Sequence, residues 1–312
     1  MRRLALPFVL AVLALALAAT GCGSSELGSS GSDQAAPAAE GGGVPDGADF
    51  LATAVEAGQG LDSAHYILDA SVTLTGSSPQ LAFVAQGPIT LHLEGDASET
   101  AFTAEGSVGF AGQTFTGNLL AGEHEVFLNF MGKWYGTKDA GLADAAEQRA
   151  DGTVSDPQEA IQAVREHFGD VLTGEVSEGP AVDGVETWRF EGTLNAAGIV
   201  GLAQDLGGKD MTAEETAQLQ AIADAATVVV DFGRGDSLPR HLEFQLSLGA
   251  DELAELSDGA SLDGVESFDM SVTVDLSDFG KDVSFEAPDQ FAPFEDLFGQ
   301  LFGIAMALQP AA

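Results

Sequence analysis

The sequence predicts an α+β domain built around an antiparallel β-sheet. Apolar residues recur at every second position in many short runs, and turns rich in Gly, Asp and Ser separate these runs. A period of two is typical of strands with one apolar face, and short connections favour hairpins between neighbouring strands. Segments in the middle and at the end of the chain change to a helical period, so helices are expected beside the sheet.

Residues 66–130 predict a meander of five strands. In the first of them, Tyr66, Leu68, Ala70, Val72 and Leu74 alternate with more polar neighbours, which places the apolar side chains on one face. The pattern recurs along the chain, and because sequential strands usually pair, successive hairpins are expected. The five predicted strands cover residues 66–74, 89–93, 102–110, 115–119 and 126–130.

The second half predicts helices between further strands. Asp156 followed by Pro157 and Glu159 is typical of a helix start, and so is Thr212 followed by Glu215. Helices are expected over residues 156–168, 195–206, 212–223 and 294–306, the last of them amphipathic and rich in Phe. Strands are expected over residues 188–194, 228–232, 242–248, 268–276 and, ending at Pro288, 283–285.

The first 21 residues predict an export signal. Arg2 and Arg3 precede an almost unbroken apolar run from Leu4 to Ala19, which is shorter than the ~20 residues of a membrane-spanning helix. The run ends in Ala19-Thr20-Gly21-Cys22, which resembles the lipobox of bacterial lipoproteins, where the cysteine thiol receives a diacylglyceryl group. Since Cys22 is the only cysteine, lipidation is its expected role, with the chain anchored on the extracytoplasmic face of the cell membrane.

Composition divides the chain into three expected parts. Residues 1–21 are the signal peptide, and residues 22–47 carry the lipidated cysteine and a linker of Gly, Ser, Ala, Pro and acidic residues. Such a linker behaves as a flexible coil and spans ~25–30 Å. Residues 48–312 are expected to form a single domain.

The charge of the chain excludes several kinds of partner. Forty-nine acidic residues against 11 Lys and Arg give a formal net charge of −38. This balance excludes binding to nucleic acid, and it excludes attraction to anionic lipid through basic residues. The acidic residues lack the spacing of a calcium loop and the five His lack that of a metal site, so no metal and no cofactor are expected.

One segment matches a catalytic motif. Gly235-Asp236-Ser237-Leu238 has the nucleophile motif of the GDSL hydrolases, but those enzymes also need a later Asn for the oxyanion hole and an Asp-x-x-His near the end. This chain has no Asn after Asn195. The segment is therefore interpreted as a hairpin turn, and hydrolysis by Ser237 is the weakest of three functional hypotheses.

Short motifs spread over most of the chain after Ala64 carry a family resemblance. They are Gly132-Lys133-Trp134-Tyr135, residues 182–187 leading into Trp188-Arg189-Phe190, Leu238-Pro239-Arg240, and residues 276–280 followed by Ala287-Pro288. With the lipobox, they resemble the actinobacterial LppX/LprAFG-like lipoprotein family, which includes mycobacterial glycolipid and triacylglyceride carriers and is similar in fold to the periplasmic LolA/LolB-like lipoprotein carriers. The resemblance implies a strongly curved antiparallel sheet, a half-barrel, with helices covering its concave face, an apolar cavity and no catalytic residue.

The leading hypothesis is a membrane-anchored lipoprotein, without enzymatic activity, that binds or carries lipid or acylated envelope molecules. The alternative is an envelope scaffold or sensor whose filled core binds no small molecule and whose acidic surface meets a protein partner. The candidate cavity residues are the large apolar side chains of the predicted elements: Phe102, Phe110, Phe115, Leu119, Leu128, Phe130, Trp134, Ile161, Val164, Phe168, Trp188, Phe190, Phe244 and Phe298.

Overall fold

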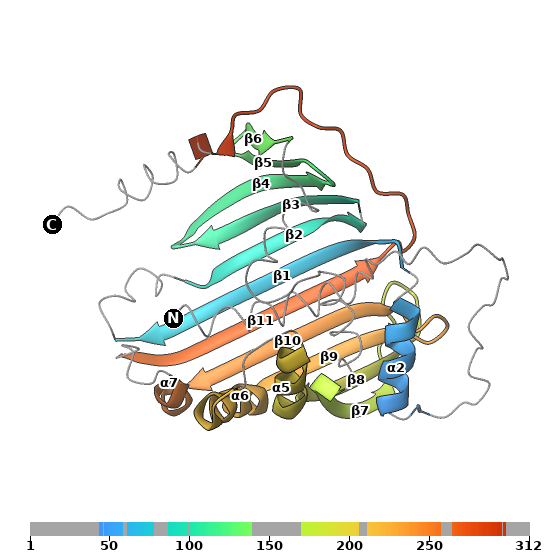
Figure 1. The fold of residues 1–312 in the computed structure, drawn as a ribbon, viewed down its shortest axis with the longest axis vertical. Helices are drawn as coiled ribbons and strands as arrows, with labels where there is room; N and C mark the ends of the chain where they lie inside the picture. The colour runs from blue at the N-terminus through green and yellow to red at the C-terminus, as the bar shows by residue number, and fades with distance from the viewer. Residues whose placement is uncertain are drawn as a thin grey trace.

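A single antiparallel sheet of eleven strands dominates the computed structural model (Figure 1). The strand order is β6-β5-β4-β3-β2-β1-β11-β10-β9-β8-β7, so β6 and β7 form the edges and the sheet is not closed. The expected α+β fold with an antiparallel sheet is confirmed. The structure describes residues 44–45, 47–58, 61–77, 87–98, 100–138, 170–205, 211–256, 264–294 and 296–297.

The chain forms the sheet in two halves. Strands β1 to β6 run from the middle of the sheet to one edge, and strands β7 to β11 run from the opposite edge back to the middle. The first meander consists of β1 (Ser63–Gly76), β2 (Ile89–Ser98), β3 (Ala101–Phe110), β4 (Gln113–Gly122), β5 (Val126–Phe130) and β6 (Lys133–Thr137). The second returns from the opposite edge through β7 (Leu172–Glu178), β8 (Thr187–Leu194), β9 (Ala226–Gly233), β10 (Pro239–Gly249) and β11 (Val265–Ser277). The two meanders join where β11 pairs with β1, from His65 opposite Ser277 to Gly76 opposite Val265.

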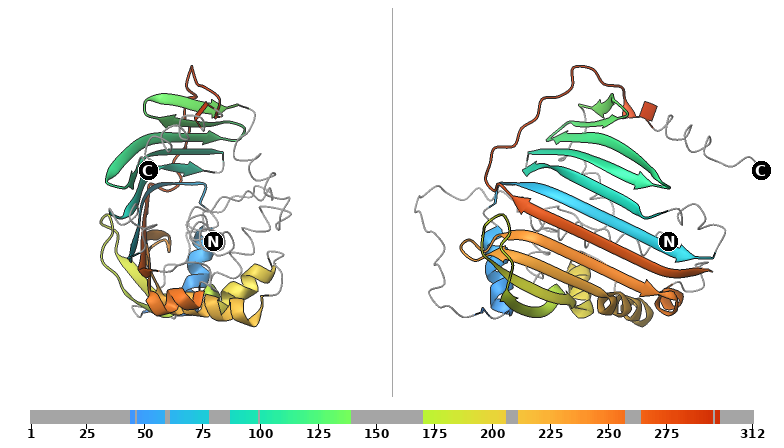
Figure 2. Two further views of the ribbon diagram at one scale, coloured as in Figure 1. Left: turned by 90° about the vertical axis from the view of Figure 1, so that its left-hand side faces the viewer. Right: turned by 180° about the vertical axis from the view of Figure 1, so that it is seen from behind.

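The described helices lie on one side of a bent sheet (Figure 2). They are α2 (Gly47–Gly58), α5 (Ala196–Asp205), α6 (Ala213–Ala225) and α7 (Ala250–Leu256). They contact the second meander: α2 reaches β7, α6 reaches β8 and β10, and α7 reaches β10 and β11. None of the helices in the described ranges has the length and apolarity needed to cross a membrane.

Local sequence explains where α6 begins. The Thr212 hydroxyl accepts a hydrogen bond from the Glu215 amide at 3.2 Å, and the Glu215 carboxylate accepts one from the Thr212 amide at 2.8 Å. This reciprocal capping satisfies two amides that the helix leaves free, and it confirms the predicted start. Asn195 caps α5 in a related way, since its side-chain oxygen accepts from the Ala197 amide at 3.1 Å.

Four elements were not expected from the sequence: α2, β6, β7 and α7. Both unexpected strands are short and lie at the edges of the sheet, where alternation is weakest because one side faces solvent. In β7, only Leu172 is buried and most of the other residues are exposed. Helix α7 has seven residues, too few to establish a helical period in a sequence.

The strand expected over residues 283–285 is wrong. Residues 281–288 have no regular structure, because β11, which precedes them, is already paired on both sides and offers no free edge. The segment instead runs to the β6 edge of the sheet. There the Gly136 amide donates to the Ala292 carbonyl at 2.8 Å, and Tyr135 forms an isolated bridge with Ala292. There the ring of Phe291 packs against that of Phe127, with centroids 5.1 Å apart.

Two expected helices fall wholly or mostly outside the described residues. The helix over 156–168 is one, and of the helix over 294–306 only Phe294 and residues 296–297 are described, where the chain is helical. The export signal, Cys22 and the linker as far as residue 43 are also outside the described part.

Candidate functional site

One face of the sheet is apolar across nearly all its width. Residues directly opposite each other on paired strands point to the same side of a sheet, so the pairing register identifies the members of this face. One row, followed from β7 to β5, consists of Val176, Phe190, Val230, Leu242, Val274, Leu68, Leu93, Gly106, Gly117 and Phe130. We call this side of the sheet the apolar face.

Over the second meander, helices fill the space above the apolar face. Phe50, Leu51 and Ala54 of α2 are buried in the same cluster as the strand residues, and the ring of Phe50 meets Phe232 edge-on at 5.2 Å. Leu253 of α7 is also a member of the cluster. This cluster is a packed protein core, and it extends to Tyr66, Ala97 and Ala104 on β1, β2 and β3.

Over β2, β3 and β4 the apolar face includes a group of six small residues among larger ones. Gly95, Ala97, Ala104, Gly106, Gly117 and Ala121 all lie on this side of their strands. The glycines permit close approach of neighbouring backbones: a Cβ on Gly106 would lie 2.3 Å from the His92 carbonyl oxygen, and one on Gly117 would lie 2.5 Å from that of Asn129. This part of the face therefore contributes little side-chain volume of its own. We call these six positions the small-residue floor.

Large aromatic and aliphatic side chains border the small-residue floor. The rings of Tyr66 and Phe102 stack at 5.3 Å, and those of Phe115 and Phe130 stack at 6.3 Å. Leu119 and Leu128 lie opposite each other on β4 and β5. The surroundings of the floor are thus almost entirely hydrocarbon.

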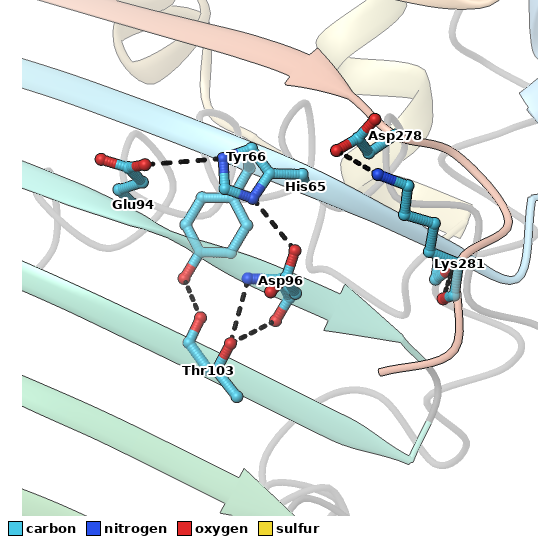
Figure 3. A network of polar contacts seen from close by, with 8 residues as sticks. His65, Tyr66, Glu94, Asp96, Thr103, Asp278 and Lys281 are labelled. Atoms are coloured by element: carbon cyan, nitrogen blue, oxygen red, sulfur yellow. Dashed lines mark hydrogen bonds and ion pairs between the residues drawn. The ribbon is translucent and has the colours of Figure 1, made fainter. Parts of the chain in front are cut away.

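Tyr66 brings a polar group to these surroundings, and its hydroxyl is satisfied. The hydroxyl donates a hydrogen bond to the Thr103 carbonyl at 3.0 Å (Figure 3). Burial and the nearby Asp96 raise the pKa of Tyr66 above its ordinary value, so the group stays neutral. A satisfied neutral hydroxyl adds no charge to the apolar face.

The opposite face of the sheet is polar. Three histidines on this side each face an aspartate directly across a strand pair: His65 and Asp96 at 3.0 Å (Figure 3), His92 and Asp69 at 2.8 Å, and His241 and Asp275 at 2.6 Å. Beside this face, after β11, a hydrogen bond from Lys281 lowers the pKa of Asp278. Within the described part of the chain, no group of three or more His, Cys, Asp and Glu is arranged to hold a metal ion.

The structure brings most of the described candidate cavity residues to the apolar face, in two groups. Trp188, Phe190 and Phe244 belong to the core under the helices or pack against it. The other group borders the small-residue floor on β3, β4 and β5, where Phe102 and Leu119 also pack against the core cluster, and its members are Phe102, Phe110, Phe115, Leu119, Leu128 and Phe130. Ile161, Val164, Phe168 and Phe298 lie outside the described residues.

Trp134 does not join the other candidates. It pairs with Asn129, whereas its neighbour Tyr135 pairs with Leu128, so Trp134 points to the opposite side of the sheet. Sequence reasoning also missed the small-residue floor, although the alternation of Gly and Ala with polar residues in 95–97 and 104–106 was visible.

Ser237 lies in the turn between β9 and β10, as interpreted from the sequence. Its amide donates to the Gly233 carbonyl at 2.8 Å, and the Asp236 carboxylate accepts from the Leu238 amide at 3.1 Å. His241 is engaged with Asp275 on the polar face. The contacts of this segment are those of a hairpin.

Comparisons with known proteins give structural likeness only. No protein-family model matches the sequence, and no curated protein matches it. The chain is similar to two mycobacterial lipoproteins. The structure of lipoprotein LppX from Mycobacterium tuberculosis has a TM-score of 0.38 and 15% identity over 77% of this chain and 98% of that chain. The structure of LprF from Mycobacterium bovis has a TM-score of 0.38 and 13% identity over 79% of this chain and 99% of that chain.

Proposed function

We propose that this protein is a lipid-anchored lipoprotein of the cell envelope that binds or carries acylated or otherwise apolar molecules over the small-residue floor. Cys22 carries the anchor, and residues 48–312 form the binding domain. No catalytic step is part of the proposal. The observation that carries it is the change within one apolar face: helices α2 and α7 pack on one half, and the other half holds a group of buried alanines and glycines bordered by large apolar side chains.

The energetics of a carrier fit such a face. Burying an acyl chain stabilises it by ~0.8 kcal/mol per CH₂, so a chain of ~16 carbons gains about 12 kcal/mol, and it loses a similar amount on leaving a bilayer. Net transfer is then close to neutral, which allows loading and release. This balance requires a hydrocarbon lining with few fixed charges, which is the composition around the floor.

Loss of the anchor is the first expected result. A Cys22→Ala variant lacks the thiol that accepts the diacylglyceryl group, so metabolic labelling with palmitate should fall to background. A Ser24→Ala variant, two residues away, should be labelled as the wild type is. Palmitate label that persists in Cys22→Ala would contradict the proposed anchor.

Lipid binding is tested on the mature chain from residue 22 onward. Native mass spectrometry is expected to show co-purified acylated molecules, and the delipidated protein should take up a fluorescent fatty acid from solution. Absence of both results would favour the alternative, a scaffold or sensor with a filled interior. Ester hydrolysis that disappears in Ser237→Ala would instead favour the hydrolase hypothesis.

A further inference from the structure

Acidic residues are missing from one end of the first meander. Residues 106–122 contain no charged side chain, and residues 126–138 contain only Lys133 and Lys138. At the chain's average of 49 acidic residues in 312, these thirty residues would carry about five. The acids of this region, Glu123 and Glu125, lie in the turn at the other end of β4 and β5.

The two hairpin turns at this end share one geometry. Ala111 and Gly112 connect β3 to β4 with φ of 50° and 73°, and Met131 and Gly132 connect β5 to β6 with φ of 53° and 80°. Both are two-residue turns with two left-handed residues, a conformation that favours Asn or Gly at the first position. Methionine is therefore an unfavourable residue at position 131.

Packing of the Met131 side chain does not offset its unfavourable turn conformation. It is 73% exposed, the most exposed large apolar residue among those described, and Val108 on β3 is 42% exposed. The ring stack of Phe115 and Phe130 joins the two hairpins behind them. An exposed apolar side chain in a strained position, between strands that carry no acids, fits a contact outside the folded chain.

We propose that this uncharged end, residues 106–117 and 130–133, rests on the surface of a lipid bilayer, with the Met131 side chain entering the interface. The inference deepens the proposed function, because it places the edge of the small-residue floor against the source of its ligand. The linker from Cys22 spans ~25–30 Å and keeps the domain within reach of the bilayer.

Residues 106–122 and 126–138 carry none of the acidic charge, and the segment that pairs with β6 at Ala292 carries the exposed Asp289 and Asp296. Glu105, the nearest acid along β3, is six residues from the turn at Ala111, a distance of ~20 Å along a strand. Repulsion between exposed charges is largely screened beyond ~8–10 Å at physiological ionic strength. Lys133 beside the turn is exposed, and its Nζ lies 4.8 Å from the centroid of the Tyr135 ring.

Met131→Asn tests the contact without weakening the fold. The experiment uses the chain from residue 22 with Cys22→Ser, so that no acyl anchor contributes, and measures flotation with vesicles of phosphatidylcholine containing phosphatidylglycerol. The substitution should weaken vesicle binding about tenfold, since much of the transfer free energy of a methionine side chain is lost. Unfolding should occur at an unchanged or higher denaturant concentration, because Asn prefers this turn position.

Val44→Asn is the matched control. Val44 is 54% exposed and precedes α2, which packs beside β7 at the opposite edge of the sheet, so its replacement should leave vesicle binding unchanged. Gln113→Glu, which introduces an acid at the exposed start of β4, should weaken binding to the vesicles that contain phosphatidylglycerol.

The two proposals fail differently. Equal vesicle binding by wild type and Met131→Asn, or an equal loss in Val44→Asn, would overturn the membrane contact. Fatty-acid uptake from solution should be the same in wild type and Met131→Asn, since Met131 is not part of the floor. If the wild type takes up no fatty acid at all, the proposed function fails, whatever the vesicles show.

Discussion

Replacing Arg189 with Met is expected to lower the free energy of unfolding by about 3–5 kcal/mol. Arg189 on β8 donates two hydrogen bonds to Asp231 on β9, from Nε to Oδ1 at 2.8 Å and from Nη2 to Oδ2 at 2.7 Å. The Asp231 side chain is only 1% exposed. Without Arg189, its carboxylate is left buried and uncompensated, and this desolvation dominates the expected loss.

The surroundings of the pair explain why water cannot replace the arginine. The connection between β7 and β8 covers Asp231, since a Cβ on Gly179 would lie 2.9 Å from the Asp231 Oδ1. The Thr187 hydroxyl donates to the Pro180 carbonyl at 2.5 Å and holds this connection in place. Hydrogen bonding to Asp231 raises the pKa of Arg189 above its ordinary value, so the guanidinium remains charged.

A double variant separates the burial penalty from a general packing defect. Arg189→Met with Asp231→Leu removes both charges, and a buried pair replaced by apolar residues is often neutral in stability. The double variant should therefore recover most of the loss, as measured by urea unfolding monitored by circular dichroism. A double variant as unstable as Arg189→Met alone would show that the loss arises from packing.

Much of the sheet could be predicted because apolar and polar residues alternate strongly along each central strand. In β1, β10 and β11 the apolar residues fall at every second position, so the strands and their inner faces follow from the sequence. The pairing of β11 with β1 could not be predicted in this way. It joins segments some two hundred residues apart, and the alternation identifies a face but not a partner.

The candidate site was predictable in part for the same reason. Large apolar residues on β3, β4 and β5 have the period of their strands, and the structure places them on one face. Trp134 was misplaced because β6 was not expected, and without a register its side could not be assigned. The small-residue floor was missed because glycine and alanine give no hydrophobic signal, although the proposed function depends on their small size.

The second large expected effect concerns the proposed ligand position above the small-residue floor. An Ala104→Phe variant is expected to reduce fatty-acid uptake at least tenfold while changing the free energy of unfolding by less than about 1 kcal/mol. Ala104 lies within the small-residue floor, between Gly95 and Leu119 on the neighbouring strands. If ligand occupies the space above the floor, the added ring fills that space in the lipid-free protein and excludes the acyl chain.

Ala226→Phe is the matched control on the same apolar face. Ala226 is fully buried at the start of β9, next to the C-terminus of α6, where protein side chains fill the space. Overpacking there should cost about 1–3 kcal/mol and leave uptake unchanged in the protein that remains folded. The two alanines thus receive the same ring on the same sheet. Both are buried, with Ala104 3% and Ala226 0% exposed, and the carrier proposal requires that ligand can take the place above Ala104. If Ala104→Phe is destabilised as much as Ala226→Phe, the chain's own side chains fill the floor and the carrier proposal fails.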